Sequence, residues 1–129
     1  MSAIVDDIGV PVALYFCPGN VSDYKTIQPT LNRVIQNPYC RVPLYADKGY
    51  DSDATRRMIR FHGYIDRVAK RRIRTHRVVN RKRGIVERVF SWFDKYRRLL
   101  LRYDALVLSY EGWSYLAACR LLSNKLEKL

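Results

Sequence analysis

Residues 42–52 read VPLYADKGYDS, and the architecture of the chain is organised around them. Residues 42–46 form a short apolar run, typical of a buried strand, that stops at Asp47. Lys48-Gly49-Tyr50 then turns the chain, and Ser52 is a good N-cap for a helix, with Asp53 well placed at its positive end. A buried strand followed by a turn and a helix is typical of α/β domains.

The rest of the chain predicts an α/β layered domain with the order β-β-α-β-α-β-α-α. Apolar residues at 2–5 and 10–16 flank Asp6-Asp7-Ile8-Gly9, whose turn chemistry predicts a β-hairpin. A helix capped by Ser22 or Asp23 is expected to run to about Gln36, where Asn37-Pro38 ends it.

The second half of the chain predicts a short strand, a basic loop and two helices. The helix after Ser52 is expected to end near Phe61, where His62-Gly63 closes it, and 64–68 is the strand. Residues 70–81 lack apolar periodicity, which indicates a loop, and from Arg83 apolar residues recur at helical spacing. The apolar stripe of the first of these helices comprises Val86, Val89/Phe90, Phe93, Tyr96/Arg97 and Leu100. Tyr103-Asp104 is a break. The apolar stripe of the closing helix then comprises Leu106, Tyr110, Trp113, Ala117 and Leu121.

The composition fits one globular domain spanning residues 1–129. Hydrophobic residues make up 48% of the chain, enough for a core, yet no apolar run reaches the roughly 18–20 residues that a membrane span needs. The N-terminus lacks the features of a signal peptide, so we expect a cytoplasmic protein without a membrane partner.

Cys17, Cys40 and Cys119 are far apart, which favours buried free thiols over a disulfide framework or a zinc site.

The positive charge of the chain is concentrated in its second half. The formal net charge of +12 divides into −2 for residues 1–55 and +14 for residues 56–129. Basic blocks bind polyanions, and phosphate neutralisation by Lys and Arg supplies most sequence-independent affinity for nucleic acid. A solvated surface without a partner is the alternative. The residues that we expect to contact DNA are Arg83, Lys70, Arg71, Arg72, Arg74, Arg77, Lys95, Arg97 and Arg98.

Asp47 and Glu87 are the candidate metal ligands. Asp47 ends a strand, where ligands of open α/β sheets bind, although an aspartate there also caps turns. Glu87 lies beside the apolar stripe of its helix, and the alternative for it is a surface ion pair with Arg83 at i−4. Two carboxylates suit Mg²⁺, and a pair of such ions about 3.5–4 Å apart clamps a phosphodiester, but this chemistry requires at least one more carboxylate.

Aromatic and basic residues alternate after Glu87, from Trp92 to Tyr103. Arg and Lys hold phosphates, and Tyr or Trp stack on bases. Packing in the core is the alternative for the aromatic side chains, and we favour it for Phe93 and Tyr96.

Three motifs resemble segments of bacterial insertion-sequence transposases of the DDE type. Residues 44–52 resemble their ADKGYDS segment, and 9–12 with 18–23 resemble the segment before the second aspartate. Residues 86–93, followed by Tyr96-Arg97-Arg98-Leu99 and Arg102-Tyr103-Asp104, resemble their glutamate helix. The matches follow the family's order from about Ile4 to Leu122.

The resemblance implies a ribonuclease-H-like fold that cuts and rejoins DNA with a divalent metal, Mg²⁺ or Mn²⁺. Asp47 matches the second catalytic aspartate, Glu87 the catalytic glutamate, and Arg83 the arginine four residues before that glutamate. Asn80 and Asp94 replace the family's tyrosine and lysine on this helix. The implied partners are the transposon ends and the target DNA, and the implied location is the nucleoid.

The family's first catalytic aspartate lies on a strand upstream of the hairpin, whereas Asp6 and Asp7 fall in the turn. The resemblance therefore implies a C-terminal portion of the catalytic domain, ribonuclease-H-like but incomplete at its N-terminus. A missing central strand leaves unpaired edges, so we expect the chain alone to be inactive and poorly soluble, with a second copy or an upstream transposase segment as partner. The alternatives are a non-catalytic nucleic-acid-binding module, a decayed transposase remnant and a basic ribosome-associated protein.

Overall fold

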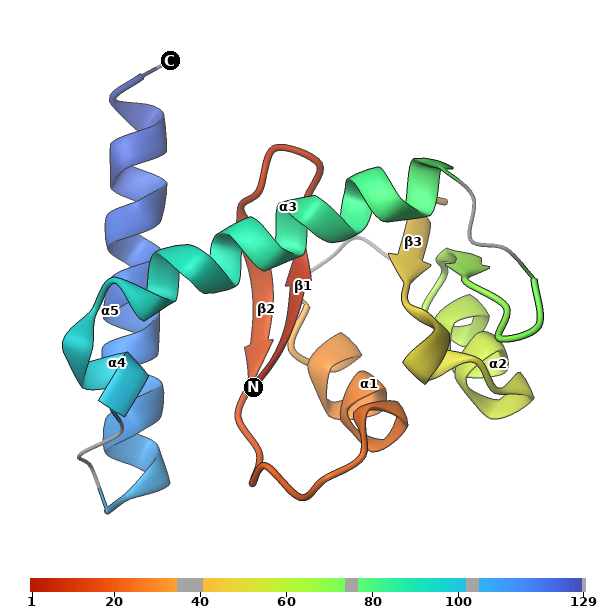
Figure 1. The fold of residues 1–129 in the computed structure, drawn as a ribbon, viewed down its shortest axis with the longest axis horizontal. Coiled ribbons are helices and arrows are strands. Elements are labelled where there is room, and N and C mark those ends of the chain that lie inside the picture. Colours follow the sequence, from red (N-terminus) through yellow and green to blue (C-terminus); the bar gives the residue numbers. More distant parts are fainter. Residues whose placement is uncertain (35–40, 74–76, 102–104, 129) are drawn as a thin grey trace.

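Residues 1–34, 41–73, 77–101 and 105–128 are described by the computed structural model, a mixed α/β structure (Figure 1). In chain order the elements are β1 (Ser2–Val5), β2 (Pro11–Tyr15), α1 (Asp23–Leu31), β3 (Pro43–Ala46), the 3₁₀ helix η1 (Lys48–Tyr50), α2 (Asp53–Phe61), β4 (Ile65–Val68), α3 (Arg77–Asp94), α4 (Arg97–Leu101) and α5 (Val107–Leu126). The predicted order of strands and helices is confirmed, with η1 and α4 in addition.

The strands β1 and β2 form the predicted antiparallel hairpin, with Ser2 opposite Tyr15. In its turn, the Asp6 carboxylate accepts hydrogen bonds from the backbone N–H groups of Ile8 and Val10 at 3.1 and 2.6 Å. Gly9 has a φ of +84°, which glycine adopts without a Cβ penalty. Asp6 is therefore committed to the turn, in agreement with the sequence-based expectation.

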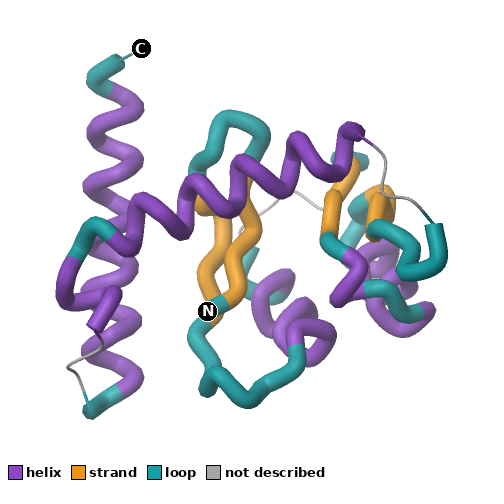
Figure 2. Tube along the Cα trace, in the orientation of Figure 1, coloured by secondary structure: helices purple, strands orange, loops and turns teal. Residues whose placement is uncertain are grey.

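The strands make two separate sheets, which α1 and α3 hold together. The strands β3 and β4 pair in parallel, with Ala46 opposite Val68, and β1–β2 is the other two-stranded sheet. The helix α1 packs against β1 and β2 and also contacts η1 and α2. The helix α3 packs against both β1 and β3, and Figure 2 shows it running across the two pairs of strands.

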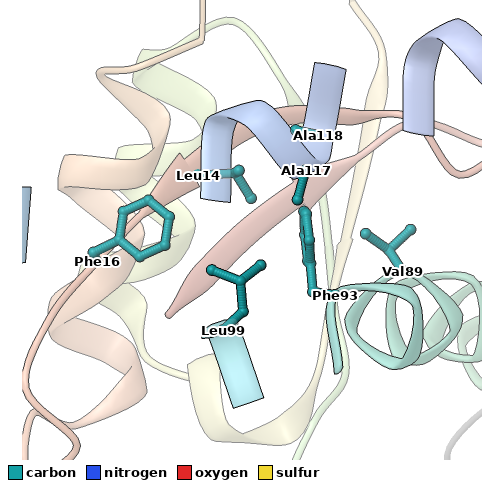
Figure 3. Close-up of a cluster of buried hydrophobic side chains, with 7 residues drawn as sticks. All are labelled: Leu14, Phe16, Val89, Phe93, Leu99, Ala117 and Ala118. Atoms are coloured by element: carbon teal, nitrogen blue, oxygen red, sulfur yellow. The ribbon is translucent and has the colours of Figure 1, made fainter. Parts of the chain in front are cut away.

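Two clusters of buried side chains form the core. One joins β2 to the C-terminal helices and comprises Leu14, Phe16, Val89, Phe93, Leu99, Ala117 and Ala118 (Figure 3). The other lies around β3 and β4 and comprises Ile27, Leu31, Leu44, Ile59, Tyr64 and Val68. The prediction that Phe93 packs in the core is confirmed, whereas the same prediction for Tyr96 is wrong, because Tyr96 is exposed.

The basic loop predicted for residues 70–81 is wrong for residues 77–81, which are the first turn of α3. Five residues are too short a stretch for apolar side chains to repeat at helical spacing, so the first turn of α3 gives no periodic signal in the sequence. The single stripe predicted through Leu100 is also wrong, because α3 ends at Asp94. Backbone bonds from Lys95 N–H to Trp92 O and from Tyr96 N–H to Phe93 O tighten the chain there. The chain then turns into α4, and Leu99 reaches the cluster of Phe93.

The predicted helix ends are confirmed in part. Ser52 caps α2 through its Oγ, which accepts from Thr55 N–H at 3.1 Å, and Gly63 closes that helix with a φ of +84°. The prediction that the first long helix runs to about Gln36 is wrong, because α1 ends at Leu31. Asn32 follows as its C-cap, and the Asn32 N–H donates to the Gln28 carbonyl at 3.0 Å. The predicted ends at Asn37-Pro38 and Tyr103-Asp104 lie outside the described residues.

The closing helix is confirmed, but Leu106 and Trp113 of its predicted stripe are exposed. Cys17 and Cys119 are free, as predicted, but the prediction that they are buried is wrong, because Cys17 is half-buried and Cys119 is exposed. Cys40 lies outside the described residues. None of the helices within the described ranges is long and apolar enough to cross a membrane.

Candidate functional site

Asp47 lies where β3 ends and the chain turns into η1. Its Oδ1 accepts a hydrogen bond from Lys48 N–H at 2.7 Å, so Asp47 caps η1, and the turn-capping role considered for it is confirmed. Because β3 and β4 are parallel, their C-terminal residues Ala46 and Val68 lie side by side at the same edge of the sheet. The carboxylate therefore stands at the carboxyl edge of this sheet, where ligands of α/β folds commonly bind.

The Arg83 guanidinium connects Asp47 with Glu87. Arg83 Nε donates to Glu87 Oε1 at 2.9 Å, which is the i,i+4 pair that the sequence offered as an alternative. Arg83 Nη1 lies 3.3 Å from Asp47 Oδ2, a contact between α3 and the end of β3. The structure thus brings Asp47, Arg83 and Glu87 together around one cation, although 40 residues separate the two acids.

The three side chains of this cluster are open to solvent. Their exposed fractions are 57% for Arg83, 45% for Asp47 and 63% for Glu87. Ion pairs with this much exposure contribute about 0–1 kcal/mol to folding. The cluster is therefore accessible to a ligand, and the fold does not depend on its two ion pairs.

A second ion-pair network holds the turn that carries Asp47. Asp51 Oδ1 accepts from Arg56 Nη2 at 2.7 Å, and its Oδ2 accepts from Arg71 N–H at 2.9 Å. Arg56 also donates to Asp66 at 2.7 Å and to the Val68 carbonyl at 2.9 Å. The hydrogen bond from Arg56, followed by that from Arg71, lowers the pKa of the Asp51 carboxyl, and the bond to Asp51 raises the pKa of Arg56.

The basic residues predicted to contact DNA fall into separate groups. Arg71 belongs to the site, because its Nε donates to the Lys48 carbonyl at 3.2 Å; Lys70 and Arg72 beside it are exposed. Lys95 and Arg97 lie at the other end of α3, where Lys95 is about 12 Å along the helix from Glu87.

Some of the predicted site residues cannot be assigned a position. Arg74 lies outside the described residues, and the side chains of Arg77 and Arg98 are likewise not described. The same holds for the side chain of Asn80, whereas Asp94 is exposed at the last position of α3.

Sequence reasoning missed two contributions to the site. Lys82 Nζ lies 5.9 Å from the centroid of the Tyr45 ring, a contact that links α3 to β3 one residue before Arg83. Arg56 and Asp51 position the turn after Asp47. Asp51 stands within the quoted 42–52 stretch, but its partners at positions 56 and 71 follow no local spacing that would identify them.

Among the described residues, no group of three or more His, Cys, Asp and Glu side chains is placed to hold a metal ion. Asp47 and Glu87 are the two carboxylates that contact the Arg83 guanidinium.

Comparison with known proteins gives the family of this chain. The family model described as "Transposase DDE domain" matches residues 1–122. The chain belongs to the transposase DDE domain family. This DDE-domain chain is also 30% identical, over 135 residues, to a Burkholderia cepacia protein named "Putative transposase for insertion sequence element IS402".

The aligned region covers 97% of this DDE-domain chain and 63% of that relative, so the chain spans less than two thirds of the relative's length. No solved structure matches the chain. The resemblance to insertion-sequence transposases of the DDE type is thereby confirmed for the family.

Proposed function

We propose that this chain acts in DNA transposition, as the part of a transposase catalytic domain that holds Asp47 and Glu87 beside the DNA backbone. The observation that carries the proposal is the Arg83 guanidinium, which lies 3.3 Å from Asp47 and 2.9 Å from Glu87. Two acids from distant parts of the chain lie within reach of one cation, at the carboxyl edge of a sheet and on an exposed surface. The motif resemblance in the sequence implies the same two residues, since Asp47 follows residues 44–46 of the ADKGYDS-like segment and Glu87 lies in the segment that resembles the glutamate helix.

A divalent cation fits the donor set of this site. Asp47 and Glu87 offer carboxylate oxygens, the hard ligands that Mg²⁺ and Mn²⁺ prefer. Mg²⁺ is usually held by one or two carboxylates together with the phosphates of a substrate. Asp47 and Glu87 would hold the ion, which when bound supplies positive charge against the phosphodiester.

Arg83 and its basic neighbours bind and orient the DNA backbone. A guanidinium presents N–H groups in a fork that suits a phosphodiester. When DNA binds, the Arg83 N–H groups donate to its phosphate in place of the Asp47 and Glu87 carboxylates. Arg71 beside the turn and Lys95 at the far end of α3 add phosphate contacts on either side. In the reaction, an oxygen of water or of a DNA 3′-hydroxyl bonds to phosphorus and loses its proton, and the bond from phosphorus to the leaving 3′-oxygen breaks as that oxygen gains one.

A strand outside the 129 residues completes the sheet and the site. Among the described strands β1 pairs with β2 alone and β3 with β4 alone, while α3 packs against β1 and β3. A strand paired between β1 and β3 joins the two sheets into one ribonuclease-H-like sheet and carries the further carboxylate that the chemistry requires. The alignment covers 63% of the relative, so the relative has further residues beyond the matched region. This supports a longer chain or an upstream segment as the source of the strand.

The test uses a transposase that includes the upstream strand. Mn²⁺ binding is followed by electron paramagnetic resonance, and strand transfer is measured on DNA carrying terminal inverted repeats. We expect Asp47→Asn and Glu87→Gln each to reduce activity at least about 100-fold and to weaken Mn²⁺ binding, since each removes a charged ligand. Asp94→Asn, an exposed acid on the same helix, is the matched control and leaves both unchanged. Mn²⁺ binding that survives both site substitutions contradicts the proposal.

A non-catalytic nucleic-acid-binding module is the second candidate. It is favoured by the two-carboxylate site, because the described residues hold no cluster of three acids. Both candidates give salt-sensitive DNA binding, so the salt dependence does not separate them. Dependence of strand transfer on a divalent ion separates them, because a binding module has no use for the ion.

A further inference from the structure

The parallel sheet of β3 and β4 has one covered face and one open face. Leu44 belongs to the covered face, where it packs with residues of α1 and α2 in one buried cluster. The neighbouring residue Tyr45 is on the opposite face, and the register places Arg67 of β4 beside it. On that face Arg67 and Ile65 are exposed. Parallel sheets are normally covered on both faces, so the open face is suited to a partner.

The helix α3 contributes a lysine to the open face. The inward side of α3 is marked by Val89 and Phe93, which are buried. Lys82 is on the same side, because it precedes Val89 by seven residues, a spacing that keeps two side chains on one face of a helix. Lys82 is half-buried, and its Nζ lies 5.9 Å from the centroid of the Tyr45 ring, where α3 passes β3 (Figure 1). A basic side chain therefore takes a position that is apolar further along this helix.

Neither Lys82 nor Arg67 pairs with an acid in the described part of the chain. The ion pairs found there are made by other arginines. Asp66, the acid of β4, is on the covered face beside Leu44 and is paired with arginines of α2. The open face therefore presents two cations that no carboxylate of the described residues neutralises.

We infer that the open face binds the DNA backbone, with Lys82 and Arg67 as phosphate contacts in addition to Arg83. The inference rests on the proposed function and extends its DNA path across β4. Charge complementarity selects this occupant, because an apolar partner would bury both charges without a counter-charge, whereas phosphates neutralise them and release counterions. The face is also continuous with the candidate site, since Lys82 directly precedes Arg83 and Tyr45 lies two residues before Asp47.

The Tyr45 ring holds the Lys82 ammonium group without using its N–H donors. A cation–π contact depends on the charge, so the three donors remain for phosphate oxygens. Arg67 flanks the same ring from β4, because neighbouring strands lie about 4.8 Å apart. Tyr45→Phe should therefore leave DNA binding unchanged, whereas Tyr45→Ala should weaken it, since the support for Lys82 is lost.

DNA binding by the 129-residue chain tests the inference, with fluorescence anisotropy of a labelled duplex of random sequence. We expect Lys82→Gln and Arg67→Gln each to weaken binding about three- to tenfold and to lower the salt slope by about one, because each removes a phosphate contact. Lys25→Gln is the matched control and should leave both values unchanged. Lys25 Nζ also lies 5.9 Å from a ring centroid, that of Tyr24, but on α1, which covers the opposite face. Circular dichroism verifies that each variant is folded.

Lysine acetylation, measured by mass spectrometry, locates the contact directly. DNA should protect Lys82 and leave Lys25 as reactive as before, and Lys82→Arg, which keeps the charge, should bind DNA like the wild type. Lys82 that stays unprotected, or wild-type affinity and salt slope in both Lys82→Gln and Arg67→Gln, overturns the inference and leaves the proposed function standing; another part of a longer transposase then covers the face. A wild-type chain that binds no DNA at low salt contradicts both.

Discussion

Two arginines with similar partners should respond differently to the same substitution. Arg56 makes three hydrogen bonds, at 2.7, 2.7 and 2.9 Å, with a side chain that is 15% exposed. Replacing it by Met leaves Asp51 and Asp66 with fewer donors in a partly buried setting. Hydrogen bonds to charged groups contribute about 1.5–3 kcal/mol each, and Arg60 and the Arg71 N–H remain as partners, so we expect a loss of about 2–4 kcal/mol in the free energy of unfolding.

Arg83→Met removes the same charge from an open site. Its ion pairs with Asp47 and Glu87 are exposed, so we expect a loss of at most about 1 kcal/mol. For a domain of this size, about 4 °C of melting temperature corresponds to 1 kcal/mol, which gives a drop of about 8–16 °C for Arg56→Met and at most about 4 °C for Arg83→Met.

Differential scanning calorimetry of both variants, together with DNA binding at fixed salt, measures the contrast. We expect Arg56→Met to lower the melting temperature and to retain DNA affinity below that temperature. We expect Arg83→Met to weaken DNA binding while it changes the melting temperature little. If Arg83→Met destabilises the chain as much as Arg56→Met does, Arg83 is a structural residue, and the reasoning that assigns it to a ligand site is refuted.

Four further substitutions test the fold and its pH dependence. Gly9→Ala should cost about 1–2 kcal/mol, measured by urea denaturation, because φ is +84° there; an unchanged midpoint would exclude the strain. Phe93→Ala should cost about 3–5 kcal/mol in the same assay, and Tyr96→Ala, at an exposed position, less than 1; equal costs would contradict the core assignment. The pKa of Asp51 is lowered from 3.8, so its contribution to stability is present above that pH and is lost as the pH falls below it; Asp51→Asn should lower stability at pH 7 and flatten the decline below about pH 4, and an unchanged decline would contradict this.

Local signals in the sequence were sufficient for the elements whose ends are set by neighbouring residues. The hairpin turn at 6–9 and the cap at Ser52 depend on contacts within four residues, and both are confirmed. The start of α3 could not be predicted, because helix residues at 77–81 show no apolar periodicity. The end at Asp94 was also missed, since the turn into α4 is favoured by tertiary packing of Leu99 against the cluster of Phe93.

The same distinction holds for the site. The pair of Arg83 with Glu87 follows from i,i+4 spacing on a helix and was predictable. The contact of Arg83 with Asp47 depends on how α3 crosses β3, which no local pattern specifies. Asp47 was identified because strand ends in α/β sheets are common ligand sites, whereas the network of Asp51 with Arg56 and Arg71 became evident only in three dimensions.

The central claim, that Asp47 is a metal ligand in transposition, is tested most directly by exchanging its oxygen ligand for sulfur. DNA cleavage is measured for a transposase that includes the upstream strand and carries Asp47→Cys, first with Mg²⁺ and then with added Cd²⁺. A thiolate binds soft cations much better than hard ones. We predict that the variant is inactive with Mg²⁺ and recovers activity with Cd²⁺, whereas Asp47→Ala recovers none. Activity of Asp47→Cys that equals the wild-type activity with Mg²⁺, or that Cd²⁺ leaves absent, would contradict the claim.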